Sequence, residues 1–195
     1  MKIGRRRFWL IAVVSLSLWI TGGVARASHP TVRWDIINTQ FTNPPTITAG
    51  GMGSALANDG SKVTLTGTGT FRLKPGNPHV TGGGMWTTFG PSGNITGSGT
   101  YEVTGLVRFD AGPGEAPAQI DLIGDPAERS PGLTILEIEY SDGSAGTLVV
   151  SCNFQPAPAP AFEGVTATKS FVDFFNRVAP TPNVNGNRTI FHISP

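Results

Sequence analysis

Cysteine is nearly absent from the sequence, which contains one, Cys152, among 195 residues. A single cysteine cannot form a disulfide within the chain, so a disulfide-stapled scaffold is excluded and the fold must depend on burial and on sheet hydrogen bonds. Cys152 ends an alternating run in which Leu148 and Val150 share its face. That position predicts a buried, unreactive thiol rather than a nucleophile or an intermolecular bridge.

Charged residues are also scarce, at 14% of the sequence, and five of the 14 basic residues fall within the first 27 positions, where no acidic residue occurs. The remaining nine basic residues face 13 acidic ones, so residues 28–195 carry a net charge of −4. A mildly acidic segment without lysine or arginine clusters lacks the electrostatic footprint of a nucleic-acid-binding protein. We therefore expect no nucleic-acid partner.

Residues 1–27 have the three parts of a secretory signal: a basic start, an uncharged apolar run at 8–20, and the small-x-small sequence 25–27. The apolar run has 13 residues, whereas a membrane-spanning helix needs about 20. We predict cleavage after Ala27, which gives a secreted, periplasmic or cell-surface protein with no transmembrane segment after cleavage. An N-terminal membrane anchor and a twin-arginine signal at 5–8 are the alternatives.

Motifs for metals, nucleotides and nucleophiles are missing. No His-x-His or Cys-x-x-Cys spacing occurs, so no zinc site is expected, and no other metal or cofactor is predicted. The glycine clusters precede predicted strands rather than helices, which argues against a phosphate-binding loop. The histidines, His29, His79 and His192, are scattered, so a Ser-His-Asp site could assemble only in space.

Glycine and proline are abundant, at 26 and 16 residues, and apolar and polar residues alternate strictly over 63–73. Period-two alternation with β-branched residues is typical of half-buried strands joined by turns. Around nine such strands predict an all-β fold, an antiparallel meander that closes into a barrel, with a β-sandwich as the runner-up. We expect residues 28–195 to form a single domain.

Segments 48–73 and 81–103 resemble each other at both ends, with offsets of 33 and 30 residues. The difference falls in the turn-forming connections 58–61 and 91–94. Each copy is typical of a strand, a turn and a second strand, so the sequence predicts a duplicated hairpin. A third hairpin is expected around 142–143, because Asp-Gly between alternating strands favours a tight turn.

Two segments depart from this pattern. Residues 111–132 are rich in glycine, proline and acidic residues, and as the longest irregular stretch they are a candidate functional loop. Residues 155–161 alternate proline with alanine and predict a stiff, extended connector. Residues 189–193 are expected to form a closing strand.

The phenylalanines of the C-terminal region recur at helix-like spacing, and Thr168 can cap the helix that they would form. The residues with this spacing are Phe171, Phe174, Phe175 and Val178. The sequence therefore predicts one short C-terminal helix.

Aromatic residues provide candidates for a binding site. Trp34 and Trp86 are the tryptophans that remain after residue 27, and Trp86 shares a predicted strand face with Thr88. Tryptophan on a polar face can form a platform for a sugar or another flat ligand. Trp34 and Tyr101 are further candidates, and packing into the interior is the competing interpretation.

Acidic residues provide a second set of candidates. Glu137 and Glu139 share one face of a predicted strand, and glycoside hydrolysis requires a pair of carboxylates. Asp121, in the irregular segment, is a third candidate. Alternation also explains the pair, because Leu136 and Ile138 occupy the other face.

Three functions remain open on these grounds. The first is non-enzymatic binding of a small apolar or sugar-like ligand. The second is a hydrolase or isomerase that uses the acidic residues. The third is a surface or envelope component that acts through protein contacts.

Overall fold

The computed structural model describes residues 29–73, 76, 79–158 and 160–195, so the predicted signal peptide, 1–27, lies outside the described residues. Regular structure in these residues consists of fifteen strands and a 3₁₀-helix, η1 (Pro126–Glu128), with no α-helix. Among the described residues, no helix is long and apolar enough to cross a membrane. The all-β class predicted from the sequence is confirmed.

The strands, in chain order, are β1 (Thr31–Gln40), β2 (Thr46–Ala49), β3 (Gly53–Leu56), β4 (Lys62–Leu65), β5 (Thr68–Arg72), β6 (Val80–Phe89), β7 (Ile95–Ala111), β8 (Ile120–Asp121), β9 (Arg129–Ser130), β10 (Gly132–Tyr140), β11 (Ala145–Cys152), β12 (Gly164–Lys169), β13 (Val172–Phe174), β14 (Asn176–Arg177) and β15 (Thr189–Ser194).

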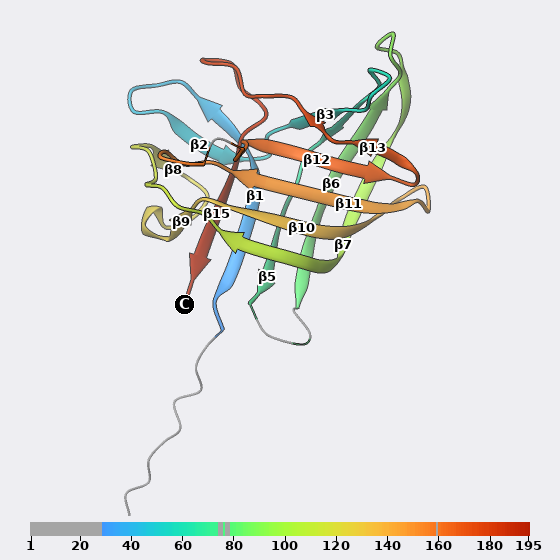
Figure 1. Cartoon of the computed structure of the whole chain (residues 1–195). Coiled ribbons are helices and arrows are strands. Elements are labelled where there is room, and N and C mark those ends of the chain that lie inside the picture. The colour runs from blue at the N-terminus through green and yellow to red at the C-terminus, as the bar shows by residue number, and fades with distance from the viewer. Residues whose placement is uncertain (1–28, 74–75, 77–78, 159) are drawn as a thin grey trace, which may run out of the picture.

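The sheet folds over on itself, and β7 connects its two halves (Figure 1). The first part of β7, from Ile95, pairs with β6, whereas its second part, up to Ala111, pairs with β10. Two register shifts interrupt the ladder between β7 and β10, and such bulges bend a strand and increase its twist. Consequently β10, β11, β12 and β13 run across the front of the molecule, while β1, β5, β6 and β15 run from top to bottom (Figure 1).

The predicted barrel is wrong, because the sheet stays open. Its main path runs β13-β12-β11-β10-β7-β6-β5-β1-β15-β9, which leaves β13 and β9 at the two ends. These end strands have three and two residues, too few for the continuous ladder that closure requires. The order is also not a simple meander, because β1 lies between β5 and β15, and the parallel pair of β2 and β8 makes the sheet mixed.

The predicted C-terminal helix is also wrong, because this region forms strands and turns. Thr168 lies within β12, and Ser170, with a positive φ of 52°, turns the chain tightly into β13. Phe174 is buried, whereas Phe171 and Phe175 are exposed. The side chains thus do not share one buried helical face, and the burial of alternate residues in β13 follows the period of a strand.

The core lies between the two halves of the sheet and contains Trp34, Tyr101 and Cys152. The two aromatic side chains pack around Gly67, where a Cβ atom would collide with the Tyr101 hydroxyl and lie 3.0 Å from the Trp34 ring. The Tyr101 hydroxyl donates a hydrogen bond of 2.7 Å to the carbonyl of Thr66. Glycine at position 67 therefore gives two large aromatic residues room in the interior.

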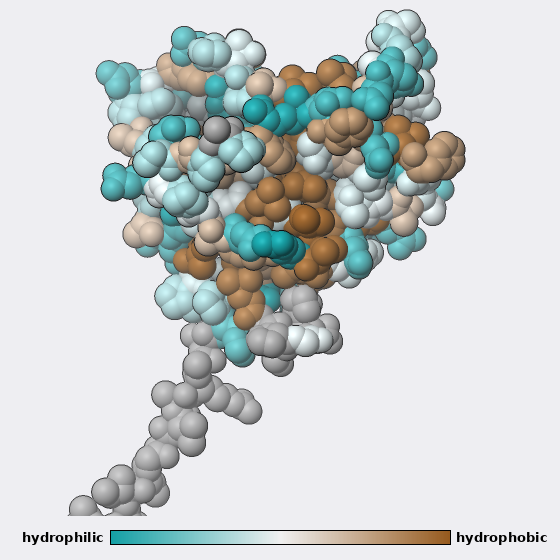
Figure 2. Space-filling model, in the orientation of Figure 1, coloured by the Kyte–Doolittle hydropathy of each residue, from teal (hydrophilic) through white to brown (hydrophobic). Residues whose placement is uncertain are grey.

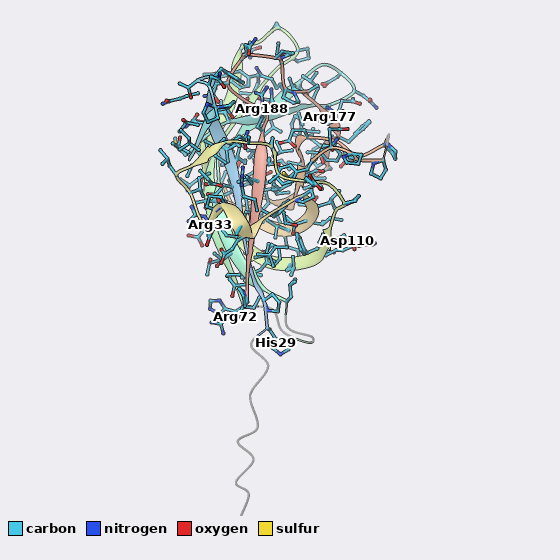
Figure 3. All side chains as sticks on the ribbon, turned by 90° about the vertical axis from the view of Figure 1, so that its left-hand side faces the viewer. His29, Arg33, Arg72, Asp110, Arg177 and Arg188 are labelled. Atoms are coloured by element: carbon cyan, nitrogen blue, oxygen red, sulfur yellow. The ribbon has the colours of Figure 1, made fainter. Side chains whose placement is uncertain are left out.

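The two ends of the molecule can be followed in Figure 3, where His29 and Arg72 lie at the lower end and Arg177 and Arg188 at the upper end. Because β14 pairs with β3, the turn that follows β3 belongs to the end away from His29. Hydrophobic residues gather in the middle of the face that β10 and β11 present to the viewer in Figure 2.

Candidate functional site

Three hairpins end in turns of the same geometry. The turns after β3, β6 and β10 each contain a glycine with left-handed backbone, namely Gly60, Gly93 and Gly143, with φ of 86°, 86° and 81°. In each turn the glycine N–H donates to the carbonyl three residues earlier, at 3.1, 2.8 and 2.8 Å. A tight turn followed by a left-handed glycine is a common way to close a hairpin.

These three turns and the turn between β12 and β13 surround a pocket of about 500 Å³. They lie together on the right-hand side of Figure 1. The turns after β3 and β6 approach each other at Gly60, where a Cβ atom would lie 3.9 Å from Pro91. The pocket volume is within the range of small-molecule sites, so we treat this pocket as the candidate functional site.

An ion pair against two aromatic rings forms one wall of the pocket. The ammonium group of Lys169 pairs with Asp142 and donates a hydrogen bond of 2.6 Å to Ser144 Oγ. The same nitrogen lies 4.5 Å from the ring centroid of Trp86 and 4.9 Å from that of Tyr140, which is cation–π geometry. The hydrogen bonds from Lys169 and Ser144 lower the pKa of Asp142 to about 2.

A second Asp-Gly-Ser turn forms another part of the wall. Oδ1 of Asp59 accepts hydrogen bonds from the backbone N–H and the hydroxyl of Ser61, at 2.9 and 2.6 Å. Asp142 makes the same two bonds with Ser144, at 3.1 and 2.7 Å. The bonds from Ser61 lower the pKa of Asp59. Oδ2 of Asp59 has no hydrogen-bond partner in the part of the chain that the structure describes, so this oxygen is free to accept one.

Trp86, a sequence-predicted ligand residue, lines this pocket. Its side chain is almost fully buried, and its indole N–H donates a hydrogen bond of 3.0 Å to the carbonyl of Thr100. Its ring stands at 84° to that of Tyr140, with centroids 5.6 Å apart. Trp86 is therefore a fixed base for the pocket, whereas Phe171, at the rim, is 96% exposed.

The other two predicted ligand residues, Trp34 and Tyr101, lie in the core and do not line this pocket. Burial raises the pKa of Tyr101 far above its ordinary value, as expected for a phenol enclosed by apolar groups. The ring of Tyr101 lies 6.3 Å from that of Tyr140, so it supports the pocket wall from behind. Both residues are buried, as the packing interpretation expects, and Tyr101 also lines a second pocket together with Glu139.

The three acidic candidates are not brought together. Glu137 and Glu139 are on the exposed face of β10, as the alternation of this strand predicts. Asp121 is buried beside β15, where its carboxylate accepts a hydrogen bond of 3.0 Å from Nε2 of His192. β10 and β15 are not neighbours in the sheet, and the hydrogen-bond and ion-pair partners of the Asp121 carboxylate within the described residues do not include either glutamate.

Asp121 instead anchors the irregular segment 111–132 to the sheet. Besides His192, its carboxylate accepts hydrogen bonds from the backbone N–H groups of Ile123 and Gly124, at 2.9 and 3.2 Å, and lies 3.7 Å from Nε of Arg129. Every one of these contacts is within the segment or to β15. We therefore interpret Asp121 as an anchor for this segment rather than as a catalytic group.

A fourth carboxylate, Glu163, was not singled out by the sequence. It accepts hydrogen bonds from the backbone N–H groups of Asn153 and Thr189, at 2.7 and 2.6 Å. Burial raises its pKa to about 7, against the opposing effect of these bonds. Glu163 thus connects the end of β11 to the start of β15. Across the described ranges, no group of three or more His, Cys, Asp or Glu side chains is placed to hold a metal ion.

Comparison with protein-family models, curated proteins and solved structures finds no match to this chain. The candidate site is therefore defined by its geometry. No sequence motif connects Lys169, Asp142 and Asp59, which meet only where the turns converge, so the sequence did not identify them as site residues. The Asp-Gly-Ser sequence that occurs at both 59–61 and 142–144 was the one signal that could have found the two aspartates.

Proposed function

We propose that this protein binds a small ligand, without catalysis, in the pocket between the four turns. The observation that carries the proposal is the Lys169–Asp142 pair held against Trp86 inside a pocket of about 500 Å³. Hydrogen bonds and aromatic contacts fix this charged pair before any ligand binds. Little side-chain entropy is therefore lost on binding, which favours affinity.

The protonation states of the pocket carboxyls support binding over catalysis. A hydrolase of the two-carboxylate type needs one carboxyl that stays protonated near neutral pH. In this pocket the pKa of Asp142 is lowered to about 2 and that of Asp59 is lowered as well. Both groups are therefore hydrogen-bond acceptors at neutral pH, not general acids. With residues 1–27 as an export signal, as their sequence pattern predicts, we propose that this binding takes place outside the cytoplasm.

The proposal is tested with a variant in which a large side chain blocks the pocket. Thr96 lines the pocket, with its hydroxyl bonded to that of Thr88 at 2.9 Å, so Thr96→Trp fills part of the volume. Thr104→Trp, on an exposed position of the same strand that does not line the pocket, is the matched control. Protein expressed from the full sequence is screened by NMR against neutral fragments of two kinds, apolar rings and polyhydroxy rings.

We expect fragments of at least one kind to shift the amide signals of the lining residues Gly90, Asp142 and Lys169 in the unmodified protein and in Thr104→Trp. Thr96→Trp is expected to lose these shifts while keeping its folded spectrum. The proposal is rejected if no fragment shifts these amides, or if Thr96→Trp responds as the control does.

A further inference from the structure

We propose that the ligand of this pocket is a neutral saccharide, bound through its hydroxyl groups by the two Asp-Gly-Ser turns and Lys169 and through an apolar ring face by the aromatic residues. This inference rests on the proposed function and narrows it to one of the two ligand classes that the sequence left open. Four features of the pocket support this inference: its hydrogen-bond acceptor, its hydrogen-bond donor, its aromatic surface and its balance of charge.

One acceptor, the Asp59 carboxylate, cannot be satisfied by an apolar ligand, whereas both oxygens of Asp142 already accept hydrogen bonds from Lys169 and Ser144. Asp59 and Asp142 both line the pocket, and each is fixed by two hydrogen bonds to the serine of its own turn. Since Oδ2 of Asp59 has no partner within the described residues, an apolar ligand that covered it would leave an ionised oxygen without hydrogen bonds. That arrangement is costly, whereas a hydroxyl group donates directly to it.

The donor is the ammonium group of Lys169. It carries three N–H bonds, of which two are used by Asp142 and Ser144. No further protein acceptor for this nitrogen occurs in the described ranges, so one N–H remains for a ligand oxygen. A hydroxyl group can accept from Lys169 and donate to a carboxylate at the same time, which an ether or a hydrocarbon cannot do.

The aromatic surface is partly fixed and partly open. Trp86 is held at the base, while Phe89 and Phe171 also line the pocket, and Phe171 is 96% exposed. A fully exposed phenylalanine at a pocket rim is costly in water unless it is covered. The C–H face of a sugar ring suits such a surface, because it is apolar although the ring edge is polar.

The charges around the pocket balance. The lining residues Asp59, Asp142 and Lys169 leave one negative charge, which Lys62 offsets from outside the lining, with its ammonium 4.4 Å from the centroid of the lining Phe89 ring. A site with no net charge gives no long-range attraction to an acidic or a basic ligand. The pocket therefore favours an uncharged saccharide over a uronate or an amino sugar.

The experiment is an array of neutral and acidic oligosaccharides, followed by calorimetric titration of any neutral hit with protein expressed from the full sequence. Asp59→Asn and Phe171→Ala are the test variants, because neither removes a buried side chain. Asp110→Asn, at a position that does not line the pocket, is the control. We expect each test variant to weaken binding roughly tenfold and the control to leave it unchanged.

The inference is overturned if no neutral oligosaccharide binds at millimolar concentration, if acidic oligosaccharides bind more tightly, or if Asp59→Asn and Asp110→Asn behave alike. The fragment screen separates the two proposals. If apolar fragments bind in the pocket but saccharides do not, the saccharide proposal is rejected and the binding function is kept. If neither fragments nor saccharides bind there, both proposals are rejected.

Discussion

Glu102 of β7 lies directly opposite Glu139 of β10 in the antiparallel register, and both side chains are exposed. Opposed residues in such a ladder have Cβ atoms roughly 5 Å apart, and like charges at that separation destabilise the pair. The like-charged pair is therefore expected to reduce the stability of the sheet at this position.

Replacing one of these glutamates should therefore stabilise the protein. We expect Glu102→Lys to raise the free energy of unfolding by about 0.2–1 kcal/mol, because the like-charged pair becomes an oppositely charged one. Urea titration at low salt measures the change. Glu115→Lys, which alters the net charge equally at another exposed position, controls for the overall charge, and an equal gain in that variant would refute the local explanation.

The pKa of Glu163 predicts how stability depends on pH. Because its pKa in the folded protein, about 7, is above its ordinary value of 4.5, the folded state binds this proton more tightly than the unfolded state. Stability from this group is full below about pH 4.5 and is lost as pH rises to about 7. At about 1.4 kcal/mol per pKa unit, the loss is up to about 3 kcal/mol.

The Glu163→Gln variant isolates this effect. Its unfolding free energy, measured by denaturant titration from pH 4.5 to 7.5, should fall less over this range than that of the unmodified protein. The measured quantity is the slope of the unfolding free energy against pH. A loss of stability that the amide causes equally at every pH does not change this slope. Parallel curves for the two proteins would show that Glu163 titrates normally.

Removing the Asp121 anchor should loosen segment 111–132. Asp121→Ala leaves the imidazole of His192 and the N–H groups of Ile123 and Gly124 without their acceptor. We expect a loss of about 1–3 kcal/mol and faster trypsin cleavage after Arg129. Asp173→Ala, at an exposed position of β13, is the control, and equal cleavage rates in the two variants would contradict the anchoring role.

A methyl group at Gly67 should be tolerated poorly. It would collide with the Tyr101 hydroxyl and crowd the Trp34 ring, so Gly67→Ala is expected to cost about 1–3 kcal/mol by overpacking. Gly105→Ala is the matched control, because the Cβ atom there meets the flexible end of the exposed Glu137 side chain. We compare the two variants by thermal unfolding. Similar melting temperatures would show that the side chains around Gly67 can rearrange to accommodate a methyl group.

The sequence predicted strand content and side-chain direction well, because alternation directly records which face of a strand is buried. Glu137 and Glu139 are exposed on β10 and Leu136 and Ile138 are buried, as their pattern predicts. Alternation does not record which strands are neighbours, and the placement of β1 between β5 and β15 depends on contacts distant in sequence. The barrel was therefore beyond what the pattern could establish.

The phenylalanines near the C-terminus show how a short pattern misleads. Spacings of three and four among Phe171, Phe174 and Phe175 fit a helix, but the backbone turn at Ser170 places Phe171 in a hairpin tip. The candidate site was predictable only in part for a similar reason. Trp86 could be identified from its strand face, whereas Lys169 and Asp142 come from different hairpins and meet only in the folded chain.

The pairing of β1 with β15 also constrains the order in which the protein can fold. Thr31 and Ser194 are partners in that ladder, so β1 cannot pair on this side until β15 has been synthesised. Contacts between residues so far apart in the chain slow folding, because the loop must be closed before they form. Until β15 is available, this end of the sheet therefore stays incomplete and β1 has an unpaired edge.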